Sequence, residues 1–418
     1  MMKYILILLI FTASISIRSQ WNPQNLASGN FGSRVHMVNS TRGYLLLSTA
    51  NQNRKIMRTD NGGMNWTATS YVQPSSYQDI FFTNENTGYI AGAVGSILRS
   101  TDAGNTFTPL VTGTTENLTR LTFLDENTGY ASGTNGTVIR TTNAGLLWTA
   151  ANIPGAGLIR FDIIDANSVI AVSGLNVYKT TNGGANWQAG ILTGRSSVGV
   201  DMVNTLTGYI AGSEGNSISS VNRTTDGGNS WQLIIDNFQS PLNGICFTSE
   251  NTGFIYGGIS SSIPSLSTSY IGKTTNGGLN WYTQSSGSNW PVTDISFSNT
   301  NIGLAIAFDV VSYTNNGGGS IGIIQTSSNI PNAFSISQNY PNPFNPVTNI
   351  EFEISKTSDV NLTIYDVNGK ELEVLVSSKL NAGTYKASWD ASKYSSGIYL
   401  YTIKSENFQE TKKMILIK

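Results

Sequence analysis

Residues Thr224–Trp231 read Thr-Thr-Asp-Gly-Gly-Asn-Ser-Trp, and variants of this octapeptide recur along most of the chain. Each has Ser or Thr first, Asp or Asn third, Gly fifth and, in all but one, an aromatic residue last. The other copies are Thr59–Trp66, Ser100–Phe107, Thr141–Trp148, Thr180–Trp187, Thr274–Trp281 and Thr314–Ile321, the last of which ends in isoleucine.

Each position of the octapeptide has a physical role that favours a tight turn. The Asp or Asn side chain and the hydroxyl can hydrogen-bond to nearby backbone N–H groups. The glycine adopts backbone angles that other residues take only at a cost, and the aromatic side chain can pack into a core and fix the turn. Seven copies in register indicate a repeat protein.

The spacing of the repeats predicts the fold. The octapeptides end at residues 66, 107, 148, 187, 231, 281 and 321, and most repeats carry an upstream Thr-Gly-Tyr-like landmark such as 87–89. Four short β-rich runs separated by Gly, Asn or Asp lie in each repeat. A period near 40 residues with four strands is typical of propeller blades. We therefore expect an all-β chain with a seven-bladed β-propeller over residues 21–326; the alternative is an open β-solenoid, which usually has shorter coils.

A closed ring of blades needs its two ends joined. The run Trp21–Leu26 reads as an outer strand without the rest of a blade, while the last repeat lacks its aromatic residue. We expect this N-terminal segment to complete or cover the seventh blade and remove an exposed strand edge. The alternative is a frayed terminus.

The composition changes near residue 327, where a polar and proline-rich stretch begins that includes Tyr340–Pro346. We expect residues 327–347 to form a linker and an extended entry segment. Residues 348–418 alternate as short strands do, with turn signals at Asn368-Gly369 and Ser396-Gly397. This pattern predicts a small immunoglobulin-like β-sandwich.

Residues 1–20 have the features of a signal peptide: Lys3 precedes the apolar stretch Tyr4–Phe11, and polar residues follow. Cleavage is expected near Ser19 or Gln20. The mature protein should leave the cytoplasm, and no later stretch is suited to crossing a membrane.

Composition excludes several classes of function. Only 12% of residues are charged and the net charge is −1, which gives no field for nucleic acid or an anionic membrane. The chain has one cysteine and one histidine, so a disulfide within the chain and a Cys- or His-based metal centre are excluded. We expect no metal, no cofactor and no catalytic residue, and we expect Cys246 to be a small buried apolar residue.

Propellers bind ligands at the mouth of the central channel, where the first strand of each blade begins. One column of the aligned repeats, three residues before Met37, Phe82, Phe123 and their counterparts, is rich in charge. It contains Arg34, Asp79, Arg120, Arg160, Gly199, Gly244 and Asp294. The five charged residues form our predicted ligand-binding site, because arginines bind carboxylate or sulfate groups through paired hydrogen bonds. Two alternatives are a water-filled channel with mutually neutralising charges, and a glycoside hydrolase using Asp79 and Asp294.

The octapeptides and their Thr-Gly-Tyr partners resemble the Asp-box, or BNR, repeats of propellers of the photosystem II assembly-factor type. This resemblance implies a propeller fold for the first three quarters of the chain, with the octapeptides as turns on the blade periphery. Sialidases share such repeats and hold a substrate carboxylate with three arginines. The chain lacks their arginine-Ile-Pro start motif, and no Tyr–Glu pair can be assigned.

The C-terminal region resembles the type A sorting domain of type IX secretion, found in Bacteroidetes-type bacteria. The matching motifs include Tyr340–Pro346, Val360–Gly369, Trp389-Asp390 and the closing Lys412–Lys418. The resemblance implies that Lys412, Lys413, Met414, Ile415, Leu416, Ile417 and Lys418 are part of an export signal. It also implies two partners, the secretion machinery and a sortase-like peptidase that removes the tail.

These observations together predict a secreted or outer-membrane-surface protein that reaches its location through the periplasm. We expect a non-catalytic binding or adhesion module for an extracellular glycan or protein. The alternatives are a secreted Asp-box glycoside hydrolase of the sialidase kind and an extracytoplasmic assembly factor.

Overall fold

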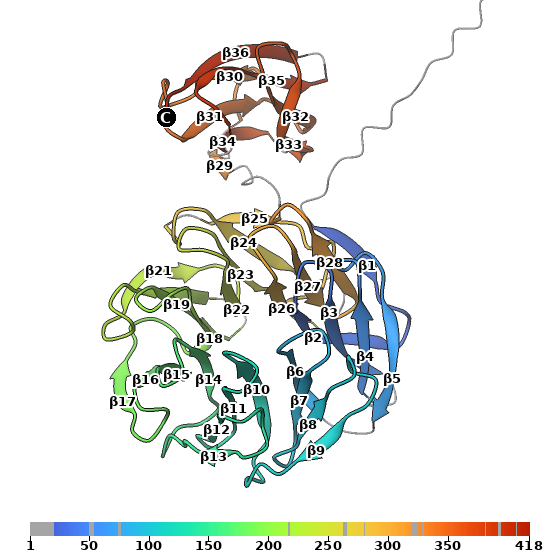
Figure 1. Cartoon of the computed structure of the whole chain (residues 1–418). Coiled ribbons are helices and arrows are strands. Elements are labelled where there is room, and N and C mark those ends of the chain that lie inside the picture. The colour runs from blue at the N-terminus through green and yellow to red at the C-terminus, as the bar shows by residue number, and fades with distance from the viewer. Residues whose placement is uncertain are drawn as a thin grey trace, which may run out of the picture.

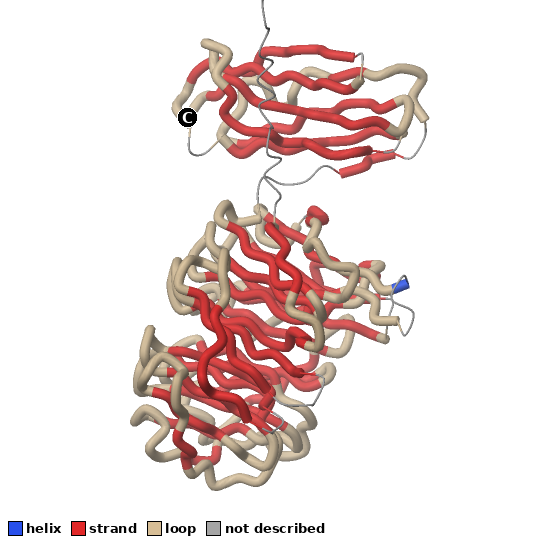
Figure 2. Tube along the Cα trace, turned by 90° about the vertical axis from the view of Figure 1, so that its right-hand side faces the viewer, coloured by secondary structure: helices blue, strands red, loops and turns tan. Residues whose placement is uncertain are grey.

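The structure is a computed structural model that describes residues 21–49, 54–73, 77–215, 218–261, 266–279, 281–318, 324–327, 330–380, 382–391, 394–406 and 408–418. The expected signal peptide, residues 1–20, and Ile321 lie outside these ranges. The named elements are β-strands, which make up almost all of the regular structure in Figure 2. In the described part of the chain, no helix is long and apolar enough to cross a membrane. The predicted all-β class is confirmed.

Across the described residues from 22 to 314, the strands form seven four-stranded antiparallel sheets, which we call blades. They lie in a ring (Figure 1). The first three blades are β2 (Asn30–Met37), β3 (Gly43–Thr49), β4 (Arg54–Thr59) and β5 (Thr67–Gln73); β6 (Tyr77–Phe82), β7 (Gly88–Gly92), β8 (Ile97–Ser100) and β9 (Thr108–Leu110); and β10 (Leu118–Phe123), β11 (Gly129–Gly133), β12 (Val138–Thr141) and β13 (Thr149–Ala150). The next two are β14 (Arg160–Ile163), β15 (Val169–Ser173), β16 (Asn176–Thr180) and β17 (Gln188–Ile191); and β18 (Ser197–Met202), β19 (Gly208–Glu214), β20 (Ile218–Thr224) and β21 (Gln232–Phe238). The last two are β22 (Leu242–Phe247), β23 (Gly253–Gly257), β24 (Tyr270–Thr274) and β25 (Tyr282–Gln284); and β26 (Val292–Phe297), β27 (Gly303–Ala307), β28 (Val310–Thr314) and β1 (Asn22–Asn25). The predicted propeller architecture is confirmed.

The second strand of each blade explains why the repeats have continuous apolar runs. All five residues of β7, β11, β23 and β27 are buried. A strand covered by neighbouring sheets on both faces has no solvent side, so its residues do not alternate between apolar and polar. The blades therefore pack face to face around the ring.

Six of the octapeptides lie between the third and fourth strands of a blade, as expected, and the seventh begins at the end of β28, the third strand of the last blade. In the copy at 224–231, the Thr224 hydroxyl donates to Asp226 Oδ1 at 2.8 Å and accepts from the Gly228 N–H at 2.9 Å. Asp226 Oδ1 also accepts from the Ser230 N–H at 2.9 Å. Gly227 and Gly228 both have positive φ angles, 70° and 81°, which glycine adopts without strain.

The tyrosine of the Thr-Gly-Tyr landmark joins neighbouring blades. Tyr209 is fully buried, and its hydroxyl donates to the carbonyl oxygens of Glu250 and Gly277 in the next blade at 3.2 and 3.1 Å. Tyr89 bonds in the same way to the carbonyl of Ala144, at 2.9 Å. The landmark therefore recurs because each copy packs one blade against the turn of the following blade.

The ring is closed by the N-terminal segment. Strand β1 pairs antiparallel with β28 and supplies the fourth strand of the last blade. Trp21, immediately before it, is 1% exposed and packs edge-on against Phe254 and Phe297. The expectation that this segment completes the seventh blade is confirmed by the pairing, and the frayed-terminus alternative is wrong.

The C-terminal region is a sandwich of two four-stranded sheets. One contains β29 (Ile324–Ser327), β34 (Gly383–Asp390), β31 (Val347–Ile354) and β30 (Ser335–Ile336) in that order; the other contains β33 (Glu371–Leu380), β32 (Ser358–Tyr365), β35 (Gly397–Ser405) and β36 (Phe408–Leu416). Their inner faces share one core, in which Phe352, Trp389, Tyr401 and Leu416 are at most 1% exposed. The small sandwich predicted from the alternating pattern is confirmed.

The segment expected to be a linker belongs to this sandwich. Residues 324–327, which we placed across the end of the propeller and the start of the linker, instead pair with β34. Within the proline-rich stretch, Phe344 is 2% exposed, and its N–H donates to the carbonyl of Ile415 at 3.0 Å. Asn342 Oδ1 accepts from the Ile415 N–H at 2.9 Å. The prolines indicated extended backbone, but the pattern did not show that this backbone is bound to the last strand.

Candidate functional site

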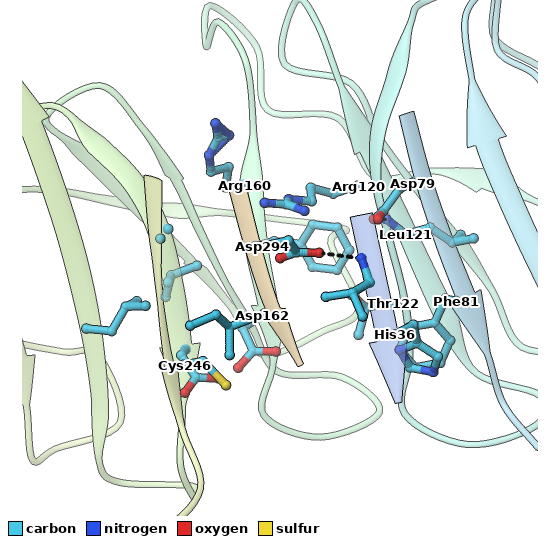
Figure 3. Close-up of a pocket in the computed structure, with 18 of the residues that line it drawn as sticks. His36, Asp79, Phe81, Arg120, Leu121, Thr122, Arg160, Asp162, Cys246 and Asp294 are labelled. Atoms are coloured by element: carbon cyan, nitrogen blue, oxygen red, sulfur yellow. Dashed lines mark hydrogen bonds between the residues drawn. The ribbon is translucent and has the colours of Figure 1, made fainter. Parts of the chain in front are cut away.

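The first strands of the blades surround a cavity of about 290 Å³ on the axis of the ring. Four of the five predicted site residues line it: Asp79 on β6, Arg120 on β10, Arg160 on β14 and Asp294 on β26 (Figure 3). Arg34, on β2, does not line the cavity itself, but its Nε lies 3.5 Å from Oδ1 of Asp79. The structure therefore brings the predicted charged residues together, and we call their column the first ring.

A second ring of side chains lies two residues further along the same strands. It comprises His36, Phe81, Thr122, Asp162, Asp201, Cys246 and Ser296, and all but Ser296 line the cavity. Figure 3 shows Arg120 and Arg160 at one level of the cavity and Asp162 and Cys246 at another. Because side chains alternate along a strand, residues two apart face the same side.

The aspartates of both rings join each blade to the next. Asp79 Oδ2 accepts from the Leu121 N–H at 2.8 Å, and Asp294 Oδ2 accepts from the Val35 N–H at 3.1 Å. Asp162 accepts from the Met202 N–H at 2.6 Å, and Asp201 accepts from the Phe247 N–H. Each donor belongs to the first strand of the following blade, so these carboxylates have a structural role in the ring.

The arginines of the first ring are crowded. Burial and then repulsion by Arg120 and Arg34 lower the pKa of Arg160 to about 10. Burial and then repulsion by Arg120 also lower the pKa of Arg34. Burial opposes the charge of Arg120 too, but attraction by Asp79 and Asp294 outweighs it and raises the pKa of that group. Two of these arginines, Arg120 and Arg160, therefore line the cavity with Arg34 close by, beside two carboxylates that each already accept a backbone hydrogen bond.

The hydrogen-bonding capacity of these arginines is only partly used. Arg160 donates through Nε to the carbonyl of Val198, and Arg34 donates through Nη1 to the carbonyl of Ser33 at 2.9 Å. No described residue accepts a hydrogen bond from the guanidinium of Arg120. Because a guanidinium has five donor N–H groups, the first ring retains donors that face the cavity.

The second ring contains two aspartates, Asp162 and Asp201, whose pKa values are raised. Burial raises the pKa of Asp162 to about 6, opposed by its two backbone hydrogen bonds. Burial and then the neighbouring Asp162 raise the pKa of Asp201 to about 8. Two carboxylates that share an enclosed site cannot both ionise easily. Near neutral pH the pair therefore retains a proton.

Asp162 and Asp201 are not among the predicted site residues, because the prediction rests on the column three residues before the aligned position. The usable signal was the two-residue period of a strand, which places the column one residue before that position on the same side. Cys246, expected to be a small buried apolar residue, packs partly buried against the hydrophobic cluster of Trp21 and Phe254 and also lines the cavity, and burial raises the pKa of its thiol well above the ordinary value.

His36 is also on the second ring. Burial lowers the pKa of its imidazole to about 4, and its Nε2 lies 2.9 Å from the carbonyl oxygen of Phe82. The imidazole of His36 is therefore neutral at physiological pH. Among the described residues, no three His, Cys, Asp or Glu side chains are grouped so that they could hold a metal ion.

Two regions of the chain match the models of known families. Residues 338–418 match the model of the secretion system C-terminal sorting domain. Residues 79–227 match that of the photosynthesis system II assembly factor YCF48. A search of curated proteins finds no match.

Solved structures with a similar fold are propellers. YCF48 bound to a D1 peptide has a TM-score of 0.56 at 16% identity over 71% of this chain and 97% of that one. YCF48 from Cyanidioschyzon merolae has a TM-score of 0.55 at 15% identity, covering 71% and 98% of the two chains. The WD40 propeller domain of Doa1 has a TM-score of 0.55 at 10% identity, covering 70% and 96%. These similarities show the propeller fold.

Proposed function

We propose that this chain, a propeller with YCF48-type repeats followed by a secretion-system sorting domain, is an extracellular binding module that holds an anionic group in its channel mouth. The sorting domain makes it a secreted or surface-exposed protein. In this proposal Arg34, Arg120 and Arg160 provide the positive charge. The ligand is a glycan or protein outside the cell, and the module acts without catalysis.

The observation that carries the proposal is the crowding of three guanidinium groups around a cavity. The repulsion that lowers the pKa of Arg160 would be relieved by a bound carboxylate or sulfate. Arg120 has no acceptor among the described residues, and charge-assisted hydrogen bonds from arginine to an anion are stronger than neutral ones. An anion in the cavity therefore gains both attraction and hydrogen bonds.

Two features of the first ring argue against the hydrolase alternative. A glycoside hydrolase needs two carboxyl groups that are free to exchange protons with substrate and water. Asp79 and Asp294 are each engaged by a backbone N–H of the next blade, and Asp79 also lies beside Arg34. Binding by this fold has a precedent, since one similar propeller was solved with a bound peptide.

The route to the cell exterior is also part of the proposal. We propose that residues 1–20 direct the chain to the periplasm, that the C-terminal sandwich then directs it across the outer membrane by type IX secretion, and that a sortase-like peptidase removes this sandwich. The match of residues 338–418 to the sorting domain supports this route.

The test is direct binding by the mature full-length protein. Anionic and neutral oligosaccharides and acidic peptides are titrated into the wild type and into Arg120→Gln and Arg160→Gln variants. Because a hydrogen bond to a charged group contributes about 1.5–3 kcal/mol, each variant should lose roughly 10- to 100-fold in affinity. Arg58→Gln is the matched control, because Arg58 is bonded to Asp60 on the surface.

The same samples distinguish binding from catalysis. Turnover of any oligosaccharide that disappears in Arg120→Gln would make the protein a hydrolase and contradict the non-catalytic proposal. Binding that is equally strong in the wild type and both arginine variants would move the ligand site away from the channel.

A further inference from the structure

Three aromatic side chains form a cluster between the last blade and the first. Phe31 and Phe308 stack with ring centroids 4.4 Å apart at 22°. Trp290 packs against Phe308 at a tilt, with ring centroids 4.9 Å apart at 44°. We call Phe31, Trp290 and Phe308 the aromatic platform.

Strand topology places the platform at the same end of the propeller as the arginines. Phe31 lies on β2, three residues before Arg34. Trp290 precedes β26, the strand that carries Asp294. Phe308 follows β27, whose last residue Ala307 pairs with Val292 at the start of β26. All three therefore lie where the first strands begin, which is the end where the first ring faces the cavity.

The platform exposes apolar surface that ring closure does not require. Closure is already provided by β1 pairing with β28 and by buried Trp21. Phe308 nevertheless remains 39% exposed, and no described residue accepts a hydrogen bond from the indole N–H of Trp290. An aromatic ring and an unused donor at a rim beside a charged pocket are typical of a ligand-binding surface.

Polar side chains next to the platform are acceptors and hydroxyls. Asp309 is exposed, and its Oδ1 accepts from the Ser288 hydroxyl at 2.9 Å. The Ser288 Oγ in turn accepts from the Trp290 N–H of the backbone at 2.9 Å. A ligand with both apolar C–H faces and hydroxyl groups matches this mixture.

We propose that the aromatic platform is a sugar-stacking subsite, so that the ligand of the channel mouth is an acidic oligosaccharide. This inference rests on the proposed function, because the arginines must hold the carboxylate of one unit while a neighbouring unit lies on the platform. Along β2, three residues separate the platform from Arg34, about 10 Å at roughly 3.3 Å per residue. One sugar ring does not cover that distance, so the ligand is longer than a monosaccharide.

Charge complementarity favours an acidic glycan over the other anionic polymers. Nucleic acid binding needs a series of basic contacts to phosphates, and the chain has a net charge of −1. The platform offers flat aromatic surface and hydroxyl partners, whereas an acidic peptide gains little from ring stacking. A glycan whose units carry both a carboxylate and hydroxyl groups can place the carboxylate of one unit at the arginines and the hydroxyl groups of the next unit beside Asp309, so it uses both parts of the surface.

The experiment titrates oligogalacturonates of increasing length into the mature full-length protein by calorimetry, with neutral galactan oligomers and polyglutamate as comparison ligands. Phe308→Ala and Trp290→Ala should each weaken oligogalacturonate binding roughly tenfold, which is about 1.4 kcal/mol. Phe308→Leu keeps apolar packing against Phe31 but removes the ring face, so it should weaken binding while the protein stays folded. Leu147→Ala is the matched control, since Leu147 is 61% exposed in an octapeptide turn.

Each outcome has a defined meaning. Arginine-dependent binding of oligogalacturonate that also requires Phe308 and Trp290, and that strengthens with chain length, supports the inference. Arginine-dependent binding that all platform variants retain overturns it and leaves the proposed function in place. Arginine-dependent binding of polyglutamate without binding of oligogalacturonate also overturns the sugar-stacking inference and leaves the proposed function in place. No binding of any anion overturns both.

Discussion

The indole Nε1 of Trp21 donates a hydrogen bond of 2.8 Å to Oε1 of Gln284, which is 263 residues later in the sequence. Gln284 continues the connection, because its Nε2 donates to the carbonyl of Gly318 in the last octapeptide. Both side chains are buried. Trp21 is thus connected through Gln284 on β25 to the octapeptide of the last blade, and these bonds add to the ring closure that β1 provides by pairing with β28.

Replacing Trp21 with alanine should strongly destabilise the propeller. Removal of a buried tryptophan side chain typically costs about 3–5 kcal/mol of unfolding free energy. Thermal unfolding followed by calorimetry should show this as a clear drop in Tm. Trp21→Phe is the matched control: it keeps the contacts with Phe254 and Phe297 but loses the hydrogen bond, so it should cost about 1 kcal/mol. An alanine variant as stable as the wild type would show that closure does not depend on Trp21.

A second prediction concerns the octapeptide at 141–148, where alanine takes the place of a glycine. Ala144 has a φ of 57°, which costs an L-residue roughly 1–2 kcal/mol. Glycine relieves this strain but loses more backbone entropy on folding, so Ala144→Gly should raise the unfolding free energy by up to about 1 kcal/mol. Denaturant titration at constant m value measures the change.

The matched control for Ala144→Gly is the reverse substitution in another copy. Gly277 has a φ of 68°, and an added Cβ would lie 3.2 Å from the Tyr209 hydroxyl oxygen and 3.3 Å from a backbone oxygen. Gly277→Ala should therefore destabilise the protein by about 1 kcal/mol or slightly more. Opposite signs for the two variants confirm that backbone strain is the cause, and equal signs contradict it.

Sequence periodicity predicted the parts of the fold that repeat. The octapeptide chemistry, the four strands per repeat and the charged first ring all follow from residue type at a fixed position, so one correct alignment reveals them. The side-chain contacts between blades do not follow from residue type at a fixed position. Asp201 accepts a hydrogen bond from the Phe247 N–H, and the sequence of neither repeat indicates a side-chain to backbone bond between adjacent blades.

The repeat pattern in the sequence also did not predict contacts that occur only once in the chain. The aromatic platform combines Phe31 from the first blade with Trp290 and Phe308 from the last blade. These residues are far apart in the sequence, and no repeat spacing relates them. Residues 324–327 contain no strong strand signal, yet they pair with β34 because that edge of the sandwich is open to them. A contact that occurs once in a chain leaves no periodic signal, and only the folded arrangement reveals it.

A third prediction concerns export. Deletion of residues 412–418 should stop secretion, but it also removes Met414 and Leu416, which are buried in the sandwich core. A milder change is Asn342→Ala, which removes the bond from the Ile415 N–H to Asn342 Oδ1 at 2.9 Å. Loss of one such hydrogen bond costs about 1 kcal/mol, so the secreted fraction should fall while some export remains.

The export experiment compares protein in the medium with protein in the periplasm by immunoblot. Lys404→Ala is the control for surface charge, because Lys404 is exposed on the neighbouring strand β35 and lies outside residues 412–418. Full export after deletion of residues 412–418 would refute the role of this strand in sorting.

The last prediction follows from the aspartate pair in the second ring. Burial, and for Asp201 also the charge of Asp162, raise the pKa values in the folded protein to about 6 and about 8, above the value of about 3.9 in an unfolded chain. A group whose pKa is raised by folding contributes stability that is fully present below its unfolded pKa and is lost as the pH rises through its folded pKa. The propeller should therefore lose stability between about pH 4 and about pH 8.

Asp201→Asn tests this pH dependence. Its amide oxygen can still accept from the Phe247 N–H, and it has no charge to desolvate beside Asp162. We expect the Tm of the variant to exceed that of the wild type by more at pH 9 than at pH 5, measured by differential scanning calorimetry in buffers of constant ionic strength. Asp226→Asn is the matched control, because hydrogen bonds from Ser230 and Thr224 hold the pKa of this surface carboxyl at about 2, so its ionisation does not change over this range. A wild-type Tm that is flat from pH 5 to pH 9, or that rises, would contradict a shared proton on the aspartate pair.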